Sequence, residues 1–129
     1  MYDREIVIDS LQKIRKTIDT ILERVSSVDD PNELLCSPEG SMRLDAVCMN
    51  LIALGEAVKG LDKQTHGELF PHYPEVYWNG VMRMRDKIAH HYFEVDIDVV
   101  FRTVREDVPL MKDVVDRMLV DMNKQQSSM

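Results

Sequence analysis

The residues best suited to chemistry lie together in one short segment. Between Arg83 and Phe93 the chain reads R-M-R-D-K-I-A-H-H-Y-F. Three basic side chains against one aspartate leave this segment a charge of +2 before either histidine is protonated. A histidine titrates near neutral pH and can take the proton of a ribose 2′-hydroxyl. An arginine can stabilise the negative charge of a crowded phosphate. The segment therefore holds the groups that metal-independent cleavage of RNA requires.

Helical geometry limits how these groups can cooperate. Arg85 and His90 are five residues apart, which on an ideal helix separates them by about 7.5 Å along the axis and about 140° around it. Arg85 and Tyr92 are seven residues apart, so on an ideal helix they are separated by only about 20° around the axis. Arg85 and His90 therefore do not converge within one straight helix. Either the chain turns back at His90 or a second subunit supplies the complementary group.

The chain around this basic segment is acidic. Its 129 residues include 16 Lys and Arg against 23 Asp and Glu, a net charge of −7. This balance argues against a surface that grips nucleic acid everywhere, so any RNA contact must come from a local basic patch. No stretch is apolar enough to span a membrane, and the N-terminus does not resemble a signal peptide. Cys36 and Cys48 form no C-x-x-C pair and favour a reducing, cytoplasmic compartment.

Apolar residues recur with helical spacing in the first half of the chain. They predict one amphipathic helix over residues 2–27 and a second over 39–62. Asp30 and Pro31 read as the start of a short turn between these helices, since aspartate caps a helix and proline suits its first turn. The second helix carries a further apolar set beside its main stripe, which favours burial on two sides and hence a homodimer. This set comprises Cys48, Met49, Ile52 and Ala53.

The second half of the chain predicts two more helices. After a connection over residues 63–74, a third helix is expected to open at Pro74 with Tyr77 on its apolar face. Asp96 is the expected N-cap of the fourth. Pro109 lies inside that helix and predicts a kink or a restart, because proline has no N–H to donate to the preceding turn.

Four helices with short links predict an all-α fold, an antiparallel four-helix bundle with short extra helical turns. The bundle is expected to form a single domain over residues 1–122. Residues 123–129 read as a polar tail that frays.

The spacing of the chemically active residues resembles a known family signature. Arg85, four residues, His90, one residue and Tyr92 match the R-x4-H-x-Y pattern of HEPN-domain proteins, specifically the HepT-like toxins. The resemblance covers about residues 43–111. Several flanking stretches agree with it: L-G-E-A-V-K at 54–59, H-Y-P-E at 72–75, M-R-D at 84–86 and Y-F-E-V-D-I-D-V-V at 92–100.

The resemblance implies a specific function. It implies a dimeric bundle in which the two signatures face each other across the interface, with Arg85 and His90 as the catalytic residues of a ribonuclease toxin. It further implies an antitoxin of the nucleotidyltransferase type, which can transfer AMP onto Tyr92. One departure from the family pattern is Asp86, which stands where the family often has Asn. The negative charge of Asp86 lowers the positive field beside Arg85. His91 fills a variable position of the signature.

Each residue also has a purely structural interpretation. Arg85 can simply pair with an acid such as Asp86 or Glu56. His90 and His91 can interact with the dipole at a helix C-terminus, and Tyr92 can be a core residue with a solvated hydroxyl. For Glu56, which lies amid apolar neighbours, a structural ion pair and support of the active-site arginine are equally favoured.

Neither a metal site nor a cofactor is predicted. His66 and His72 are six residues apart in a connection, and the other two histidines are adjacent, so none has ligand spacing. The alternative to the ribonuclease is a non-catalytic HEPN module that docks a nucleotidyltransferase partner or binds a nucleotide. A purely structural dimer would leave the cluster of Arg, His and Tyr unexplained.

Overall fold

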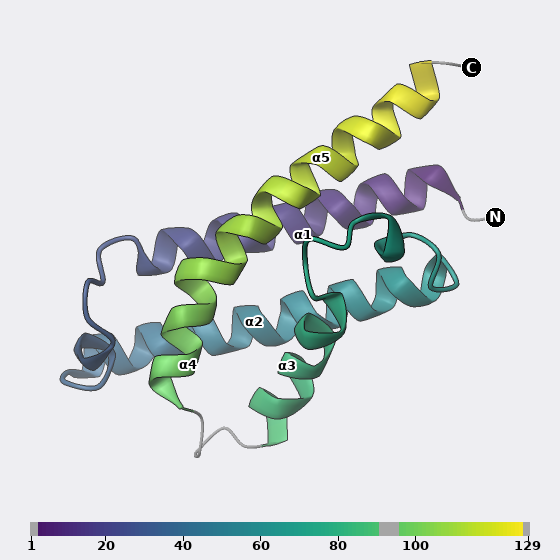
Figure 1. The fold of residues 1–129 in the computed structure, drawn as a ribbon. Helices are drawn as coiled ribbons and strands as arrows, with labels where there is room; N and C mark the ends of the chain where they lie inside the picture. The colour runs from purple at the N-terminus through teal and green to yellow at the C-terminus, as the bar shows by residue number, and fades with distance from the viewer. Residues whose placement is uncertain (1–2, 91–95, 128–129) are drawn as a thin grey trace.

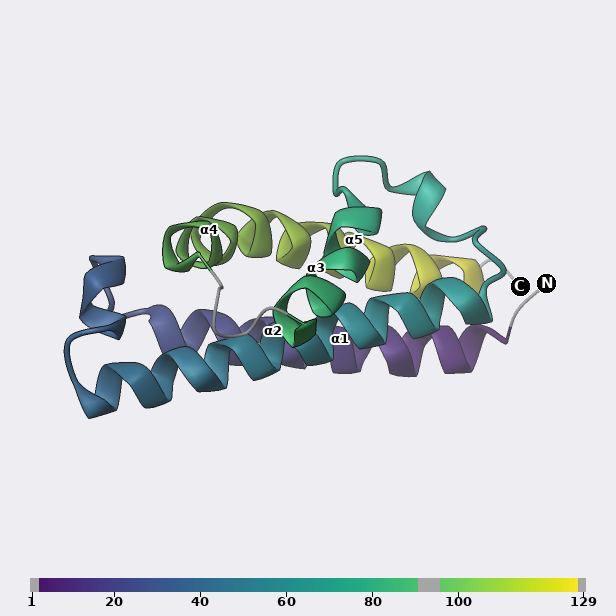
Figure 2. The ribbon, with the colours of Figure 1, turned by 90° about the horizontal axis from the view of Figure 1, so that it is seen from below.

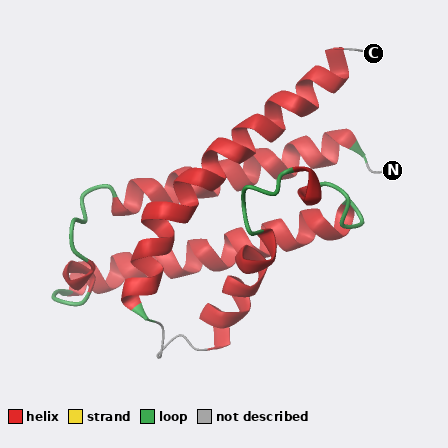
Figure 3. Cartoon of the chain, in the orientation of Figure 1, coloured by secondary structure: helices red, strands yellow, loops and turns green. Residues whose placement is uncertain are grey.

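The computed structural model describes residues 3–90 and 96–127, and within them every regular element is a helix (Figures 1 and 3). The predicted all-α bundle with short extra helical turns is therefore confirmed, and the fourth predicted helix is divided into two α-helices and a π-helical turn. Its helices are α1 (Arg4–Val25), α2 (Pro38–Gln64), α3 (Trp78–His90), α4 (Ile97–Arg102) and α5 (Val108–Ser127). Shorter turns join them: η1 (Pro31–Leu34), η2 (Phe70–His72) and the π-helical η4 (Thr103–Asp107). None of the described helices is long and apolar enough to cross a membrane.

Side-chain caps fix where several helices begin. The carboxylate of Asp3 accepts hydrogen bonds from two backbone N–H groups in the first turn of α1. The predicted caps are confirmed at Asp30 of η1 and Asp96 of α4, and Ser37 caps α2. Such caps satisfy N–H groups that have no partner inside the helix. The two long helices accordingly start within two residues of their predicted positions.

The core lies where α1 packs against both α2 and α5 (Figure 2). The stripe predicted for the first helix is buried throughout: Val7, Leu11, Ile14, Ile18, Ile21 and Val25. The stripe of the last helix is buried as well, at Val100, Val104, Met111, Val115, Met118 and Met122. The further apolar set on α2 is not buried as a whole. Cys48 is in the core, whereas the side chain of Met49 is 64% exposed.

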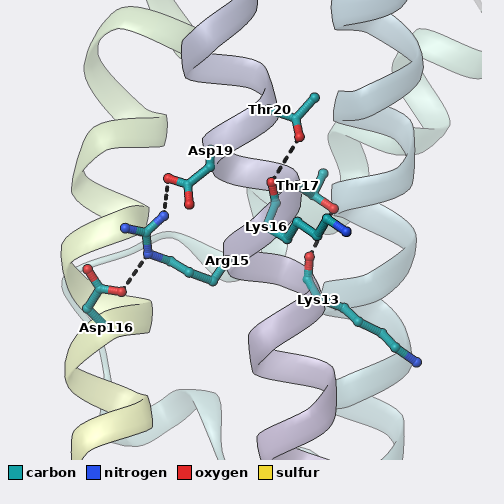
Figure 4. A network of polar contacts seen from close by, with 7 residues as sticks. All are labelled: Lys13, Arg15, Lys16, Thr17, Asp19, Thr20 and Asp116. Atoms are coloured by element: carbon teal, nitrogen blue, oxygen red, sulfur yellow. Dashed lines mark hydrogen bonds and ion pairs between the residues drawn. The ribbon is translucent and has the colours of Figure 1, made fainter.

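A polar network links α1 to α5 outside this core (Figure 4). The Arg15 guanidinium donates from Nε to Asp116 Oδ1 at 2.5 Å and pairs with Asp19 one turn further along α1. Burial alone would lower the pKa of Arg15, but the hydrogen bonds from its guanidinium to the two carboxylates outweigh it and raise that pKa. The side chain of Arg15 is only 21% exposed, but its two carboxylate partners keep it charged. Its pair with Asp116 ties α1 to α5.

The start of α3 differs from the prediction. The helix begins at Trp78 rather than at Pro74, because the indole of Trp78 takes the core position. Its Nε1 donates to the carbonyl of Tyr73 at 2.8 Å, and its ring stacks on Phe70 with centroids 4.2 Å apart. The assignment of Tyr77 to the apolar face was therefore wrong, since its side chain is 67% exposed.

The connection before α3 is anchored to α5. The hydroxyl of Tyr73 donates to Asp121 Oδ2 at 2.7 Å, and Glu75 pairs with Arg117. A hydrogen bond from the backbone N–H of Glu75 itself, followed by the one from Arg117, lowers the pKa of the Glu75 carboxyl. These contacts hold the first residues of α3 at a fixed distance from the last helix.

Pro109 interrupts the last helix, as the sequence predicted. The chain leaves α-helical geometry at Thr103–Asp107, forms a π-helical turn, and resumes as α5 at Val108. A π turn accommodates the hydrogen bond that proline cannot make. The helix then continues to Ser127, so the backbone of 123–127, expected to fray, is helical.

Gly40 marks a close approach between the first turn of α2 and η1. A Cβ atom at this position would lie 2.2 Å from the backbone oxygen of Glu33. Only glycine therefore permits η1 to pack directly on α2.

Candidate functional site

Helix α3 carries the two predicted catalytic residues. Arg85 and His90 both lie within Trp78–His90, so the backbone stays helical from one to the other. An ideal helix then keeps their positions about 140° apart. The chain does not turn back before His90. Of the two predicted routes, the contribution of a second subunit therefore remains.

The register of α3 divides these positions between two faces. Arg85 shares a line with Trp78, Val81 and Ile88, of which Trp78 and Ile88 are buried and Val81 is half-buried. His90 lies on a second line, eleven, seven and four residues after Asn79, Arg83 and Asp86. That second line is exposed or half-buried along its length up to Asp86. The two positions therefore lie on different lines along the helix.

The remaining predicted site residues are placed only in part. His91 and Tyr92 fall outside the described residues. Asp86 is half-buried on α3, and Glu56 on α2 is exposed rather than buried as the sequence indicated. Glu56 points away from the core because it is two residues from buried Leu54 and Val58, on the opposite side of the helix. Both acids have an interaction partner.

Beside the outer face of α3 lies an open hollow of about 490 Å³. Lys59 from α2 borders it on one side, and Tyr77 and residues of α3 border it on the other. The full lining is Lys59, Tyr77, Asn79, Met82, Arg83 and Asp86. Two cations and one carboxylate make the hollow net positive on an acidic chain.

An exposed aromatic ring is fixed at the edge of this hollow. The guanidinium of Arg83 donates to the hydroxyl of Tyr77, with its Cζ 5.4 Å from the ring centroid. Arg83 Nε also donates to the carbonyl of Asn79 at 3.4 Å. The ring lies so close to Gly80 that a Cβ there would be 2.6 Å from Tyr77 Cδ2. Sequence reasoning missed this arrangement, although the spacing of Tyr77, Gly80 and Arg83 was a readable signal.

A second cavity, of about 420 Å³, separates α3 from the last helices. Its lining is mainly apolar and includes Val81 and Met84 of α3 and Val108 and Met111 of α5. Glu75 and Asp107 stand at its polar edges. The inner face of α3 is therefore packed against α2 but only loosely against α5.

The described residues contain no group of three or more His, Cys, Asp or Glu side chains that could hold a metal ion. The hollow beside α3 instead offers two cations, an amide and an aromatic ring. These groups suit a phosphate and a nucleobase.

Comparison with known proteins decides the family. The model for the ribonuclease HepT-like family matches residues 14–118, which include all of α2 and α3. The chain belongs to the HepT-like ribonuclease family. The resemblance read from Arg85, His90 and Tyr92 is thus confirmed, and with it the assignment of the chain as an RNA nuclease.

Individual relatives agree with the family assignment. The chain is 35% identical over 107 residues to a "Probable ribonuclease HepT" of Thermococcus cleftensis, covering 81% of this chain and 87% of the relative. It is 27% identical over 109 residues to a "Putative RNase" of Caldanaerobacter subterraneus subsp. tengcongensis, covering 84% and 90%. A "Putative RNase" of Methanocaldococcus jannaschii is 39% identical over 64 residues, half of each chain. No solved structure is significantly similar to the chain.

Proposed function

We propose that this HepT-like ribonuclease is the toxin of a type VII-like toxin–antitoxin pair, and that it cleaves RNA without a metal at a dimer interface. Arg85 and His90 are the catalytic residues. The observation that carries the proposal is their position on one uninterrupted helix, within a chain that the HepT-like family model matches. We place the protein in the cytoplasm, where its free thiols stay reduced.

Dimerisation answers the geometric problem of the site. Positions about 140° apart on one helix do not meet at a single phosphate. A two-fold axis beside α3 would place two arginines and two histidines in one cleft, so that residues from different subunits face the same RNA. The exposed Met49 and the half-buried Ile52 of α2 offer apolar surface for such an interface.

The chemistry of the proposed site is a transesterification. One histidine takes the proton of the ribose 2′-hydroxyl, and the 2′-oxygen attacks the adjacent phosphorus. The bond from phosphorus to the 5′-oxygen breaks, and the second histidine protonates that oxygen. The products are a 2′,3′-cyclic phosphate and a 5′-hydroxyl. Arg85 stabilises the charge on the phosphate oxygens during the step. Asp86, Glu56 and His91 support these groups.

Tyr92 is the proposed point of control. A nucleotidyltransferase-type antitoxin would transfer AMP to its hydroxyl and so add bulk and negative charge two residues from His90. The adduct would compete with the RNA phosphate for Arg85. Tyr92→Phe should therefore remain toxic when the antitoxin is co-expressed, whereas the wild type is silenced and gains the mass of AMP.

Single substitutions test the catalytic assignment. Arg85→Ala and His90→Ala should abolish RNA cleavage and growth arrest, while the circular dichroism spectrum stays that of the wild type. Cleavage should persist in EDTA. Equal cleavage by wild type and both variants would exclude the Arg–His mechanism. A folded wild type that binds a nucleotidyltransferase but never cleaves RNA would favour the alternative, a non-catalytic docking module.

A further inference from the structure

We propose that the hollow beside α3 is a single-stranded RNA subsite in which an unpaired base stacks on Tyr77. This inference rests on the proposed function, since it names the form of RNA that the same helix receives. The subsite consists of Tyr77, Arg83, Asn79 and Lys59. It lies apart from the signature residues and is built wholly from described side chains.

The first observation is the exposure of Tyr77. A tyrosine with two thirds of its surface in water is not held there by burial. Instead Gly80 gives its ring room against the helix, and Arg83 binds its hydroxyl. A ring that is both exposed and fixed loses little conformational freedom when a base stacks on it. Aromatic rings bind unpaired bases in this way because every base has a π-face.

The second observation is the set of polar groups around the ring. Lys59 is exposed on α2 and contributes a cation on the far side of the hollow. The guanidinium of Arg83 lies beside the ring and can also meet a phosphate. The exposed amide of Asn79 has both a donor and an acceptor for a base edge. Together these groups match the parts of one nucleotide.

The third observation is the position of the subsite relative to the catalytic residue. Arg83 and His90 are seven residues apart on α3, hence about 10 Å along the axis and only about 20° around it. The line from Asn79 through Arg83 and Asp86 therefore leads directly to His90. A strand lying along this line would have one base on Tyr77 and a neighbouring phosphate at the catalytic end of the helix.

Binding experiments test the subsite separately from cleavage. The probe is a fluorescently labelled 12-nucleotide single-stranded RNA of mixed sequence, with a hairpin duplex of the same composition as control. All proteins carry His90→Ala so that the probe stays intact. Tyr77→Leu should weaken single-strand binding about tenfold, whereas Tyr77→Phe should stay within about twofold, because it keeps the ring. Neither should change the weaker binding of the duplex.

Two further variants separate stacking from charge. Lys59→Gln should weaken binding of all single strands alike and reduce the slope of log affinity against log salt by about 0.7. Phe101→Leu is the matched control, because Phe101 forms a similar pair with Arg105, whose Cζ lies 4.8 Å from its ring centroid. Phe101→Leu should leave binding unchanged.

The outcomes distinguish this inference from the proposed function. Unchanged binding by Tyr77→Leu, or no binding of the single strand by the parent protein, would overturn the subsite even if the wild type cleaves RNA. Equal losses from Phe101→Leu and Tyr77→Leu would also overturn it. The converse outcome is binding that depends on Tyr77 in a protein whose wild type, with His90 intact, never cleaves RNA. That result would support the subsite and refute the nuclease mechanism.

Discussion

Substituting Gly80 by alanine tests whether α3 holds the Tyr77 ring in place. The added Cβ would lie 2.6 Å from Tyr77 Cδ2 and 3.0 Å from Cε2. Normal carbon contacts are about 3.6 Å, so the ring must move by about 1 Å. It can move, because it is exposed and on a flexible side chain. The move should break the hydrogen bond from Arg83 and its contact with the ring.

The expected stability change follows from two opposing effects. Alanine in place of glycine stabilises a helix interior by about 1 kcal/mol, and somewhat less in a first turn. Losing an exposed hydrogen bond and an exposed cation–π contact costs about 1–2 kcal/mol in total. The free energy of unfolding of Gly80→Ala should therefore be close to that of the wild type. RNA binding should fall towards the value of Tyr77→Leu.

Gly60→Ala is the matched control. Gly60 is exposed inside α2, four residues before its last residue, and a Cβ there would meet no atom within 4 Å. This variant should gain the full helix propensity, about 1 kcal/mol, and melt about 4 °C higher with unchanged RNA affinity. Urea unfolding and fluorescence anisotropy measure both quantities. If Gly80→Ala is stabilised as much as Gly60→Ala and binds RNA normally, the ring is not held by Gly80.

Other consequences of the fold can be measured directly. Gly40→Ala should lower the free energy of unfolding by about 2–3 kcal/mol, because the new Cβ would meet a backbone oxygen at 2.2 Å; an unchanged urea midpoint would contradict this packing. Ellman's reagent at pH 8 should titrate Cys36 at once but Cys48 only after unfolding, since burial raises the pKa of Cys48 to about 11. The same shift should reduce stability as the pH rises from 9.0 to about 11. Asp116→Asn should lower the melting temperature by about 2–4 °C through the loss of Arg15 pairing, and less so in 1 M salt.

The helices could be predicted because apolar spacing reports directly which face is buried. The apolar positions predicted for α1, from Val7 to Val25, are buried in the core. So are those predicted for the last helix, from Val100 to Met122. The error at Tyr77 arose because tyrosine suits both a core and a surface, and the neighbouring Trp78 competed for the same core position. Pro109 located the break in the last helix, but its missing N–H does not specify a π turn over another distortion.

The candidate site could be predicted only along α3. The five-residue spacing of Arg85 and His90 sets their angular separation on a helix, and the structure shows that one helix holds both. The hollow, however, requires Lys59 of α2 to lie opposite Tyr77, which depends on how two helices pack. The exposure of Glu56 was readable from its helical phase relative to Leu54 and Val58, but its apolar neighbours in sequence obscured it.

The π-helical turn makes the last helix adjustable in length. A π turn takes one residue more than an α turn, and η4 holds it between the buried residues Val100 and Val108. Val100 and Val108 are eight residues apart, which on an uninterrupted α-helix would place them about 80° from a common line. The extra residue of the π turn takes up this difference, so both side chains reach the core. Deleting one residue from Thr103–Asp107 would convert η4 to a regular α turn and leave Val100 and Val108 seven residues apart, about 20° from one line. The turn can therefore lose its extra residue without changing which face of α4 meets the core.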